Sequence, residues 1–307
     1  MDTRHVARGG QEAISSLVVG AESLAEQLPP LLVAAERVAS IVFQGVHGRR
    51  RVGQGETFWQ FRRYQSGDAP SVVDWRTSGK SDKLYVRQME WEAAQSVWLW
   101  RDASPSMDFR SKGAWQTKRE TAELLLVALA SLLIRGGERV ALMGLNESLS
   151  STRSALVRLA TWLSGEPTEQ APNLPSVLPL PKYARLVWFT DFLVPLDQLQ
   201  SAIGAFVARG VRGVLVHIID PAEVSLPFSG RVLFAGSEGD GERLVRRVES
   251  VQAAYQDLFV AHREAVQEIA RAAGWTILTH TCDRPPHLTL LSLYLALAEG
   301  EREYSTR

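Results

Sequence analysis

The sequence contains a single cysteine, Cys282, which excludes an intrachain disulfide and a cysteine-rich zinc site. One free thiol fits a reducing compartment, and we expect a cytoplasmic protein. The N-terminus lacks the continuous apolar run of a signal peptide. The most apolar stretch, 124–134, is far shorter than the roughly 20 residues that a membrane-spanning helix needs. We therefore expect it to be a buried helix.

Charge of one sign is not in excess, since 34 lysines and arginines balance 34 aspartates and glutamates. The chain as a whole is therefore not attracted to nucleic acids or membranes. Residues 45–87 are a local exception, with nine basic and four acidic side chains. We expect a solvated basic loop there, with a docking surface for an acidic partner as the alternative. A nucleic-acid-binding module that uses this basic, aromatic-rich segment is an alternative function.

Several signatures of enzymes and nucleotide-binding proteins are also absent from the sequence. There is no P-loop and no Gly-x-Ser-x-Gly elbow, and Gly53-x-Gly55 lacks the third glycine and the helix of a dinucleotide site. We therefore do not expect an enzyme. A magnesium-dependent phosphohydrolase of the haloacid-dehalogenase type remains an alternative. Ser104, however, stands where that chemistry needs a second aspartate.

The pattern of apolar residues predicts an α/β fold, because short apolar runs alternate with helical segments from about residue 95. Such alternation is typical of a mostly parallel, Rossmann-like central sheet flanked by helices. The expected divisions are an N-terminal segment (1–28), a helix plus β-rich segment (29–92), the α/β domain (93–300) and a tail (301–307). The expected strands are 97–100, 139–145, 185–190, 213–219 and 275–280. The expected helices are 29–43, 114–134, 152–163, 195–209, 243–273 and 288–298.

Polar residues follow the predicted strands at the point where each strand ends. Asp102-Ala103-Ser104-Pro105-Ser106 follows the first strand, and Thr190-Asp191 follows the third. Ligands of open α/β sheets bind beyond the carboxyl ends of the strands, so we expect these loops to meet. Carboxylate and hydroxyl oxygens suit a hard cation, magnesium above all, with manganese or calcium as alternatives. The sequence thus predicts a metal site at Asp102, Ser104, Ser106 and Asp191, against the simpler alternative of a helix-capping turn.

Longer motifs resemble known families. Asp102-x-Ser104-x-Ser106 resembles the metal-ion-dependent adhesion site of von Willebrand factor A (vWA) domains. Other segments, covering roughly residues 30–298 together, resemble the bacterial domain-of-unknown-function 58 family. These segments are Gly53-Gln54-Gly55-Glu56-Thr57-Phe58, Arg62-x-Tyr64-x-x-Gly67-Asp68, Asp74-Trp75-Arg76, Thr190-Asp191-Phe192 and Asp220-Pro221-x-Glu223.

The resemblance implies a vWA-like fold and a protein-binding adaptor. Such an adaptor would work with a MoxR-type AAA+ ATPase in the maturation of a client protein. A further metal ligand is expected at Thr168, although its surroundings are shortened and rich in proline, and Thr152 is the alternative. We expect Trp59 and Trp75 to lie in the core. The remaining signature residues are either an interaction surface or ion pairs that hold a loop to the sheet: Gly55, Phe58, Arg62, Tyr64, Gly67, Asp68, Asp74 and Arg76.

Overall fold

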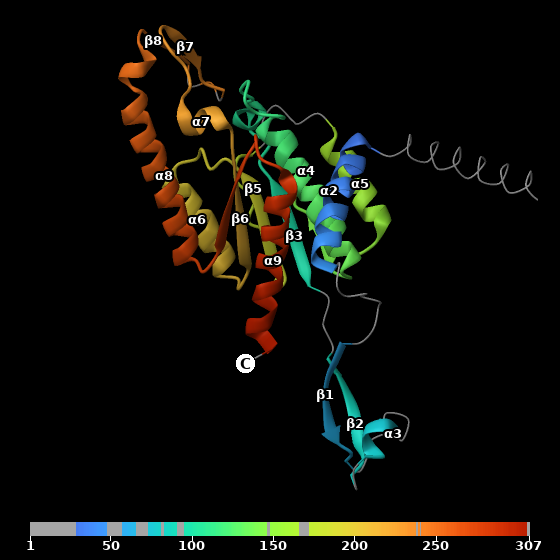
Figure 1. Cartoon of the computed structure of the whole chain (residues 1–307). Coiled ribbons are helices and arrows are strands. Elements are labelled where there is room, and N and C mark those ends of the chain that lie inside the picture. The colour runs from blue at the N-terminus through green and yellow to red at the C-terminus, as the bar shows by residue number, and fades with distance from the viewer. Residues whose placement is uncertain are drawn as a thin grey trace, which may run out of the picture. The chain divides into compact units, whose positions relative to one another are not determined.

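The computed structural model forms two compact units (Figure 1), the smaller of which is residues 44–94 and the larger the rest of the chain. The residues described are 29–47, 57–65, 73–80, 83–90, 95–145, 148–165, 172–237, 239 and 241–305.

A five-stranded parallel sheet is the centre of the larger unit, with the strand order β4-β3-β5-β6-β9. Helices cover both of its faces, which confirms the predicted Rossmann-like α/β fold and is consistent with a vWA-like domain. The strands are β3 (Ser96–Arg101), β4 (Arg139–Leu142), β5 (Arg185–Thr190), β6 (Arg212–Ile219) and β9 (Thr276–Thr281).

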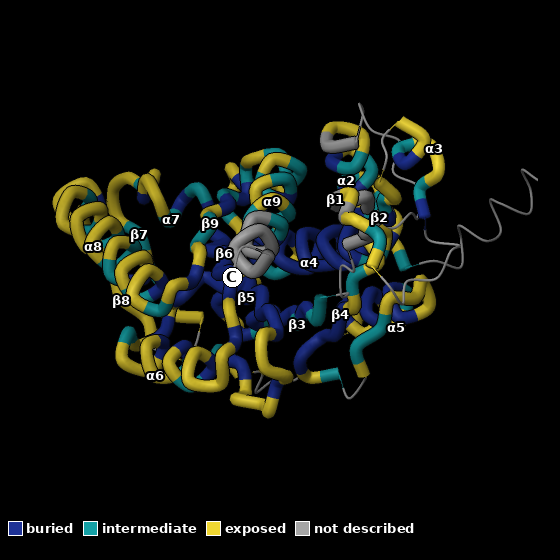
Figure 2. Tube along the Cα trace, turned by 90° about the horizontal axis from the view of Figure 1, so that it is seen from below, coloured by how far each residue is buried: buried dark blue, intermediate teal, exposed yellow. Residues whose placement is uncertain are grey.

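The helices of the larger unit form two layers, one on each face of the sheet. Helices α2, α4, α5 and α9 pack on one face, while α6 and α8 pack on the other. In Figure 2 strands β3, β4, β5 and β6 and helix α4 are largely buried, whereas α6 and α8 expose much of their surface. The helices are α2 (Pro30–His47), α4 (Lys118–Arg135), α5 (Arg153–Leu163), α6 (Leu196–Val207), α7 (Pro221–Ser225), α8 (Gln252–Ala272) and α9 (Pro286–Ser305), with short 3-10 turns η2 (Pro105–Asp108) and η3 (Val248–Ser250).

Strand β5 shows why the sheet is buried on both sides. Val187 and Phe189 enter the core shared with α4, while Leu186 and Trp188 enter the core shared with α6. All its residues are buried, because successive side chains point to opposite faces and both faces are covered.

Helix α4 begins later than the sequence predicted. Thr117 caps it by accepting a hydrogen bond from the backbone of Glu120, whose side chain accepts one from the backbone of Thr117. This capping box fixes the first turn at Lys118 rather than at Ala114. The helix ends at Gly136, as the paired glycines predicted. The start matters because it places Lys118 beside the loops that follow the strands.

The predicted helix 243–273 was wrong over its first nine residues. Here the chain forms an antiparallel hairpin of β7 (Val232–Ala235) and β8 (Glu242–Val245), and α8 begins only at Gln252. The charged run from Glu242 to Ser250 favours a helix by composition, but strand pairing overrides this weak local preference. Gly239 and Gly241 have positive φ angles and allow the chain to reverse between the two strands.

The smaller unit contains an antiparallel pair of strands, β1 (Thr57–Arg63) and β2 (Tyr85–Glu90), and a four-residue helix, α3 (Trp75–Ser78). Asp74 caps this helix by accepting a hydrogen bond from the backbone of Thr77 at 2.8 Å. Trp75 was expected in the core, but its exposed fraction is 66%. That prediction was wrong because Trp75 opens a helix of a single turn, in which only Ser78 is buried.

His280 of β9 should make the protein sensitive to acid. It is 2% exposed, and its Nδ1 lies 2.8 Å from the Thr289 hydroxyl of α9. Burial lowers the pKa of His280 to about 4 from 6.5, against the opposing attraction of Asp283. The His280 side chain of the unfolded chain therefore binds a proton below pH 6.5, whereas that of the folded chain binds it only below about pH 4. We expect this group to cost roughly 2 to 3 kcal/mol of stability between pH 7 and pH 4.5.

The measurement is urea unfolding of wild type and His280→Gln at both pH values. The variant should lose less free energy of unfolding on acidification than wild type. His287→Gln, at the start of α9, is the control and should keep the wild-type difference. An unchanged pH dependence in His280→Gln would refute the assignment.

Candidate functional site

The strand order reverses between β3 and β5. The chain leaves β3 for β4 on one side and then crosses to β5 on the other side, so β3 and β5 are neighbours. At such a reversal the two outgoing loops diverge, which leaves room for a ligand beyond the carboxyl ends of the strands. Asp102 directly follows β3 and Asp191 directly follows β5. The loops that begin at Asp102 and Asp191 therefore start side by side, at the edge of the sheet where α/β proteins bind ligands.

Asp102 ties the two loops together. Its Oδ1 accepts a hydrogen bond from the backbone of Ser104 at 2.8 Å, and its Oδ2 accepts one from the Thr190 hydroxyl at 2.7 Å. The side chain is buried, and burial raises its pKa to about 6. Both carboxylate oxygens are thus engaged by the protein itself, which makes Asp102 a positioning group for the Asp-x-Ser-x-Ser turn.

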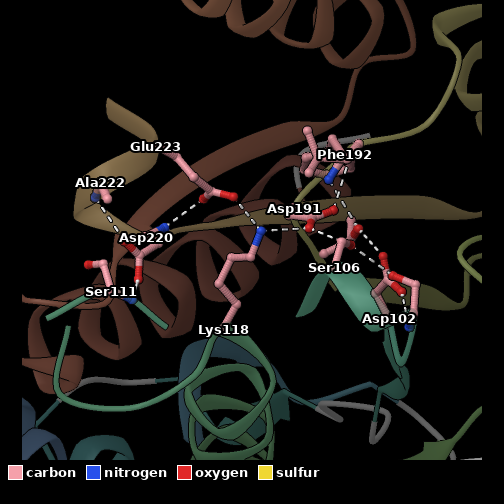
Figure 3. Close-up of polar contacts among 12 residues, drawn as sticks. Asp102, Ser106, Ser111, Lys118, Asp191, Phe192, Asp220, Ala222 and Glu223 are labelled. Atoms are coloured by element: carbon pink, nitrogen blue, oxygen red, sulfur yellow. Dashed lines mark hydrogen bonds and ion pairs between the residues drawn. The ribbon is translucent and has the colours of Figure 1, made fainter. Parts of the chain in front are cut away.

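Three further oxygens form a continuous chain across the loops. The Ser104 and Ser106 hydroxyls lie 3.0 Å apart. The Ser106 hydroxyl donates to Asp191 Oδ2 at 2.8 Å (Figure 3). All three residues are buried. Asp191 Oδ1 accepts from the backbone of Leu193 at 3.1 Å, which fixes the orientation of the carboxylate.

The loop that carries Asp191 has an unusual backbone. Phe192 has a φ of 57°, in the left-handed region that bulky side chains rarely adopt. Its carbonyl lies 3.0 Å from His262 Nε2 of α8, and its backbone amide donates to the Thr190 hydroxyl at 3.1 Å. Such strain persists only where surrounding contacts impose it, and it is common at functional sites.

A lysine that was not among the predicted site residues lies within this acidic cluster. Lys118 Nζ donates to Asp191 Oδ2 at 2.8 Å and to Glu223 Oε1 at 2.5 Å, and its side chain is 1% exposed (Figure 3). Burial alone would lower the pKa of the ammonium, but the attraction of Asp191 and Glu223 outweighs it and raises that pKa. The lysine is therefore charged.

The Asp-Pro-x-Glu motif positions Glu223. Asp220 and Glu223 form the capping box of α7, in which Glu223 Oε2 accepts from the backbone of Asp220 at 2.8 Å. Asp220 Oδ2 also accepts from the backbone of Ser111 at 2.8 Å, which holds the loop before α4. Because Glu223 Oε2 is held by the Asp220 backbone, Glu223 Oε1 is directed toward Lys118 Nζ.

The structure brings Asp102, Ser104, Ser106 and Asp191 together, and their role as metal ligands stays a prediction. Thr168 lies outside the described residues. Thr152, the alternative, caps α5 and bonds locally to Ser150 and Ser154. Lys118 was missed; the one local signal was a lysine in the first turn of a helix, where the helix dipole disfavours a cation.

The signature residues from Gly55 to Arg76 belong to the smaller unit. Phe58 and Arg62 lie on β1, Tyr64 follows it, and Asp74 caps α3. Trp75 and Arg76 are exposed. Gly55, Gly67 and Asp68 lie outside the described residues.

The oxygen spacing fits a small hard cation as well as it fits the hydrogen bonds that these oxygens form. Neighbouring ligands of an octahedral magnesium ion are about 2.9 Å apart, because the metal–oxygen bonds are roughly 2.0–2.1 Å long. The contacts among Ser104, Ser106 and Asp191 are 2.8–3.0 Å. Within the described part of the chain, no three His, Cys, Asp or Glu side chains group to hold a metal. A cation here would therefore depend on the serine hydroxyls.

A family model described as "Protein of unknown function DUF58" matches residues 60–265, more than half of the chain. The chain belongs to the DUF58 family. The DUF58 match includes β1 from residue 60 onward, all of β2 and the loops after β3, β5 and β6.

Relatives of this DUF58 protein include uncharacterized proteins of Mycobacterium tuberculosis H37Rv and Mycobacterium bovis. Each is 26% identical over an alignment of 279 positions, which covers 85% of this chain and 86% of the relative. The chain also matches solved structures. The conserved hypothetical protein BatB from Bacteroides thetaiotaomicron is 14% identical, with a TM-score of 0.37, over 68% of this chain and 100% of that chain. An uncharacterized membrane spanning protein from Vibrio fischeri is 14% identical, with a TM-score of 0.20, over 67% of this chain and 100% of that chain.

In this chain, no helix among the described residues is long and apolar enough to cross a membrane.

Proposed function

We propose that this DUF58 protein is a protein-binding adaptor that takes an acidic group of its partner through a divalent cation. Magnesium is the proposed ion, with manganese or calcium as alternatives. The observation that carries the proposal is the chain of oxygens from Ser104 through Ser106 to Asp191, which spans two loops at the reversal of strand order. Oxygens at that spacing, in that place, suit a hard cation.

The residues divide into ligands and supports. Ser104, Ser106 and Asp191 would hold the cation, while Asp102 fixes the turn through its bonds to the Ser104 backbone and the Thr190 hydroxyl. A cation held by two neutral hydroxyls and one carboxylate keeps a net positive charge and would attract a carboxylate of the partner. No bond needs to be made or broken for such binding.

Exposed apolar side chains on the same loops favour a protein as the partner. Phe109 and Trp115 lie in the segment that follows the Asp-x-Ser-x-Ser turn, and Leu193 lies two residues after Asp191. All three side chains are exposed. Aromatic side chains are enriched at protein interfaces, where they supply contact area around a polar centre. The resemblance to the family makes a MoxR-type AAA+ ATPase the proposed partner, and maturation of a client protein the proposed outcome.

Thermal unfolding with and without millimolar magnesium or manganese tests the cation. Wild type should be stabilised, by about 2.7 kcal/mol at a hundredfold excess over the dissociation constant. The double variant Ser104→Ala/Ser106→Ala should lose this shift, and Ser201→Ala, an exposed serine of α6, should keep it. Asp102→Ala is a poorer choice because Asp102 connects two loops. If wild type shows no shift with either metal, the cation proposal is wrong.

Binding of the purified ATPase to immobilised DUF58 protein tests the partner. Wild type and Ser201→Ala should retain the ATPase, and the double serine variant should not. Serine variants are preferable to a chelator because AAA+ ATPases themselves use magnesium with their nucleotide. Turnover of phosphate esters that is lost in Asp102→Asn would instead favour the phosphohydrolase alternative. The bonds that engage both Asp102 oxygens disfavour its use as a nucleophile.

A further inference from the structure

We propose that Lys118 is a tethered cation that competes with the divalent ion for Asp191, and that Glu223 is the acceptor that keeps the ammonium when the ion binds. The proposal deepens the function above and rests on it for the cation site. Such competition would set the affinity of the site for the ion and would link the site to α4 and α7.

The competition follows from one shared oxygen. Asp191 Oδ2 accepts from the Ser106 hydroxyl and from Lys118 Nζ, both at 2.8 Å. A divalent ion held by that oxygen and the serines would share it with a buried ammonium. Two cations on one oxygen repel strongly where little water screens them. The ammonium must therefore leave Asp191, or the ion binds weakly.

Glu223 is placed to receive the displaced ammonium. Its Oε1 already lies 2.5 Å from Lys118 Nζ, while its Oε2 is held by the backbone of Asp220. Lys118 therefore has to give up only one of its two carboxylate contacts. The main-chain carbonyl of Glu223 accepts from the Tyr255 hydroxyl of α8 at 2.8 Å, so the acceptor is fixed from a second side.

The position of Lys118 in its helix also indicates a specific role. It occupies the first position of α4, where the helix dipole disfavours a cation. It is also one of the largest fully buried side chains of the described residues. A buried ion pair stabilises a fold poorly compared with well-packed apolar residues. Control of the cation site gives this costly arrangement a function.

The test is the magnesium and manganese affinity of wild type, Lys118→Met and Lys118→Met/Glu223→Gln, measured by calorimetric titration. The double variant removes both members of one ion pair, so that a folded sample remains if the single variant unfolds. Lys112→Met, at an exposed lysine in the loop before α4, is the control. We expect the dissociation constant to fall by on the order of tenfold or more in both Lys118 variants, and to stay at the wild-type value in Lys112→Met.

The outcomes separate this inference from the proposed function. Equal affinities in wild type and both Lys118 variants would overturn the competition and leave the cation site intact. No binding in any protein would overturn both. Binding in the Lys118 variants but not in wild type would support the inference, and would show that the lysine takes the place of the ion, so that the metal requirement of the proposed function fails.

Discussion

Gly213→Ala should destabilise the protein by about 3 kcal/mol or more, at the upper end of overpacking effects. Gly213 lies in β6 beside Trp275, and a Cβ added to it would lie 2.0 Å from Cε3 of the indole ring, with two more ring atoms within 2.3 Å. Trp275 is buried in the core shared with α6, so its ring can move only by displacing the side chains packed around it. Denaturant unfolding monitored by circular dichroism measures the loss.

Two further variants make this prediction specific. Gly204→Ala, on α6, adds a Cβ with no atom within 4 Å and should be neutral or stabilise by up to about 1 kcal/mol. Trp275→Leu removes the obstructing ring. The double variant Gly213→Ala/Trp275→Leu should then be less destabilised than the sum of the two single variants, by about 1 kcal/mol or more. Additive losses would show that the ring is not the cause.

Lys118→Met, without added metal, should lower the free energy of unfolding by about 3–5 kcal/mol. The loss comes less from the methionine than from Asp191 and Glu223, which remain buried without the cation that they share. Adding Glu223→Gln should recover part of the loss, because a neutral amide costs less to bury than a carboxylate. Denaturant unfolding at neutral pH measures each variant.

The control for this second prediction is Lys112→Met, which should change stability by less than about 0.5 kcal/mol because Lys112 is exposed. If Lys118→Met were as stable as wild type, the ammonium would not be needed to balance the two carboxylates. The charge arrangement described for the site would then be wrong.

The elements of the sheet were predictable because they depend on local pattern. Strand β5 was predicted with its observed limits, and both β3 and β6 within a residue or two, since buried parallel strands are short apolar runs. The hairpin of β7 and β8 was missed because β8 lies in a run rich in charged residues and its pairing with β7 depends on a turn. Trp75 was misplaced because an aromatic side chain in a one-turn helix has no fixed direction from sequence alone.

The polar residues of the candidate site could be predicted from the sequence, but the buried ammonium of Lys118 could not. Asp102, Ser104, Ser106 and Asp191 could be named because they lie in the turns that follow two predicted strands, and parallel strands share their carboxyl edge. Which loops become neighbours depends on strand order, and only the structure places β3 beside β5. Their meeting at hydrogen-bonding distance is a property of that order.

The sequence by itself determined the fold class, the family motifs and four polar residues at one edge of the sheet. These features depend on the local periodicity and spacing of residues. Tertiary structure alone decided that the side chain of Lys118 lies at the same edge. A capping box sets the start of α4, and packing of that helix against the sheet carries the ammonium to Asp191 and Glu223. Contacts between residues 73 and 105 positions apart are products of packing, and no local pattern encodes them.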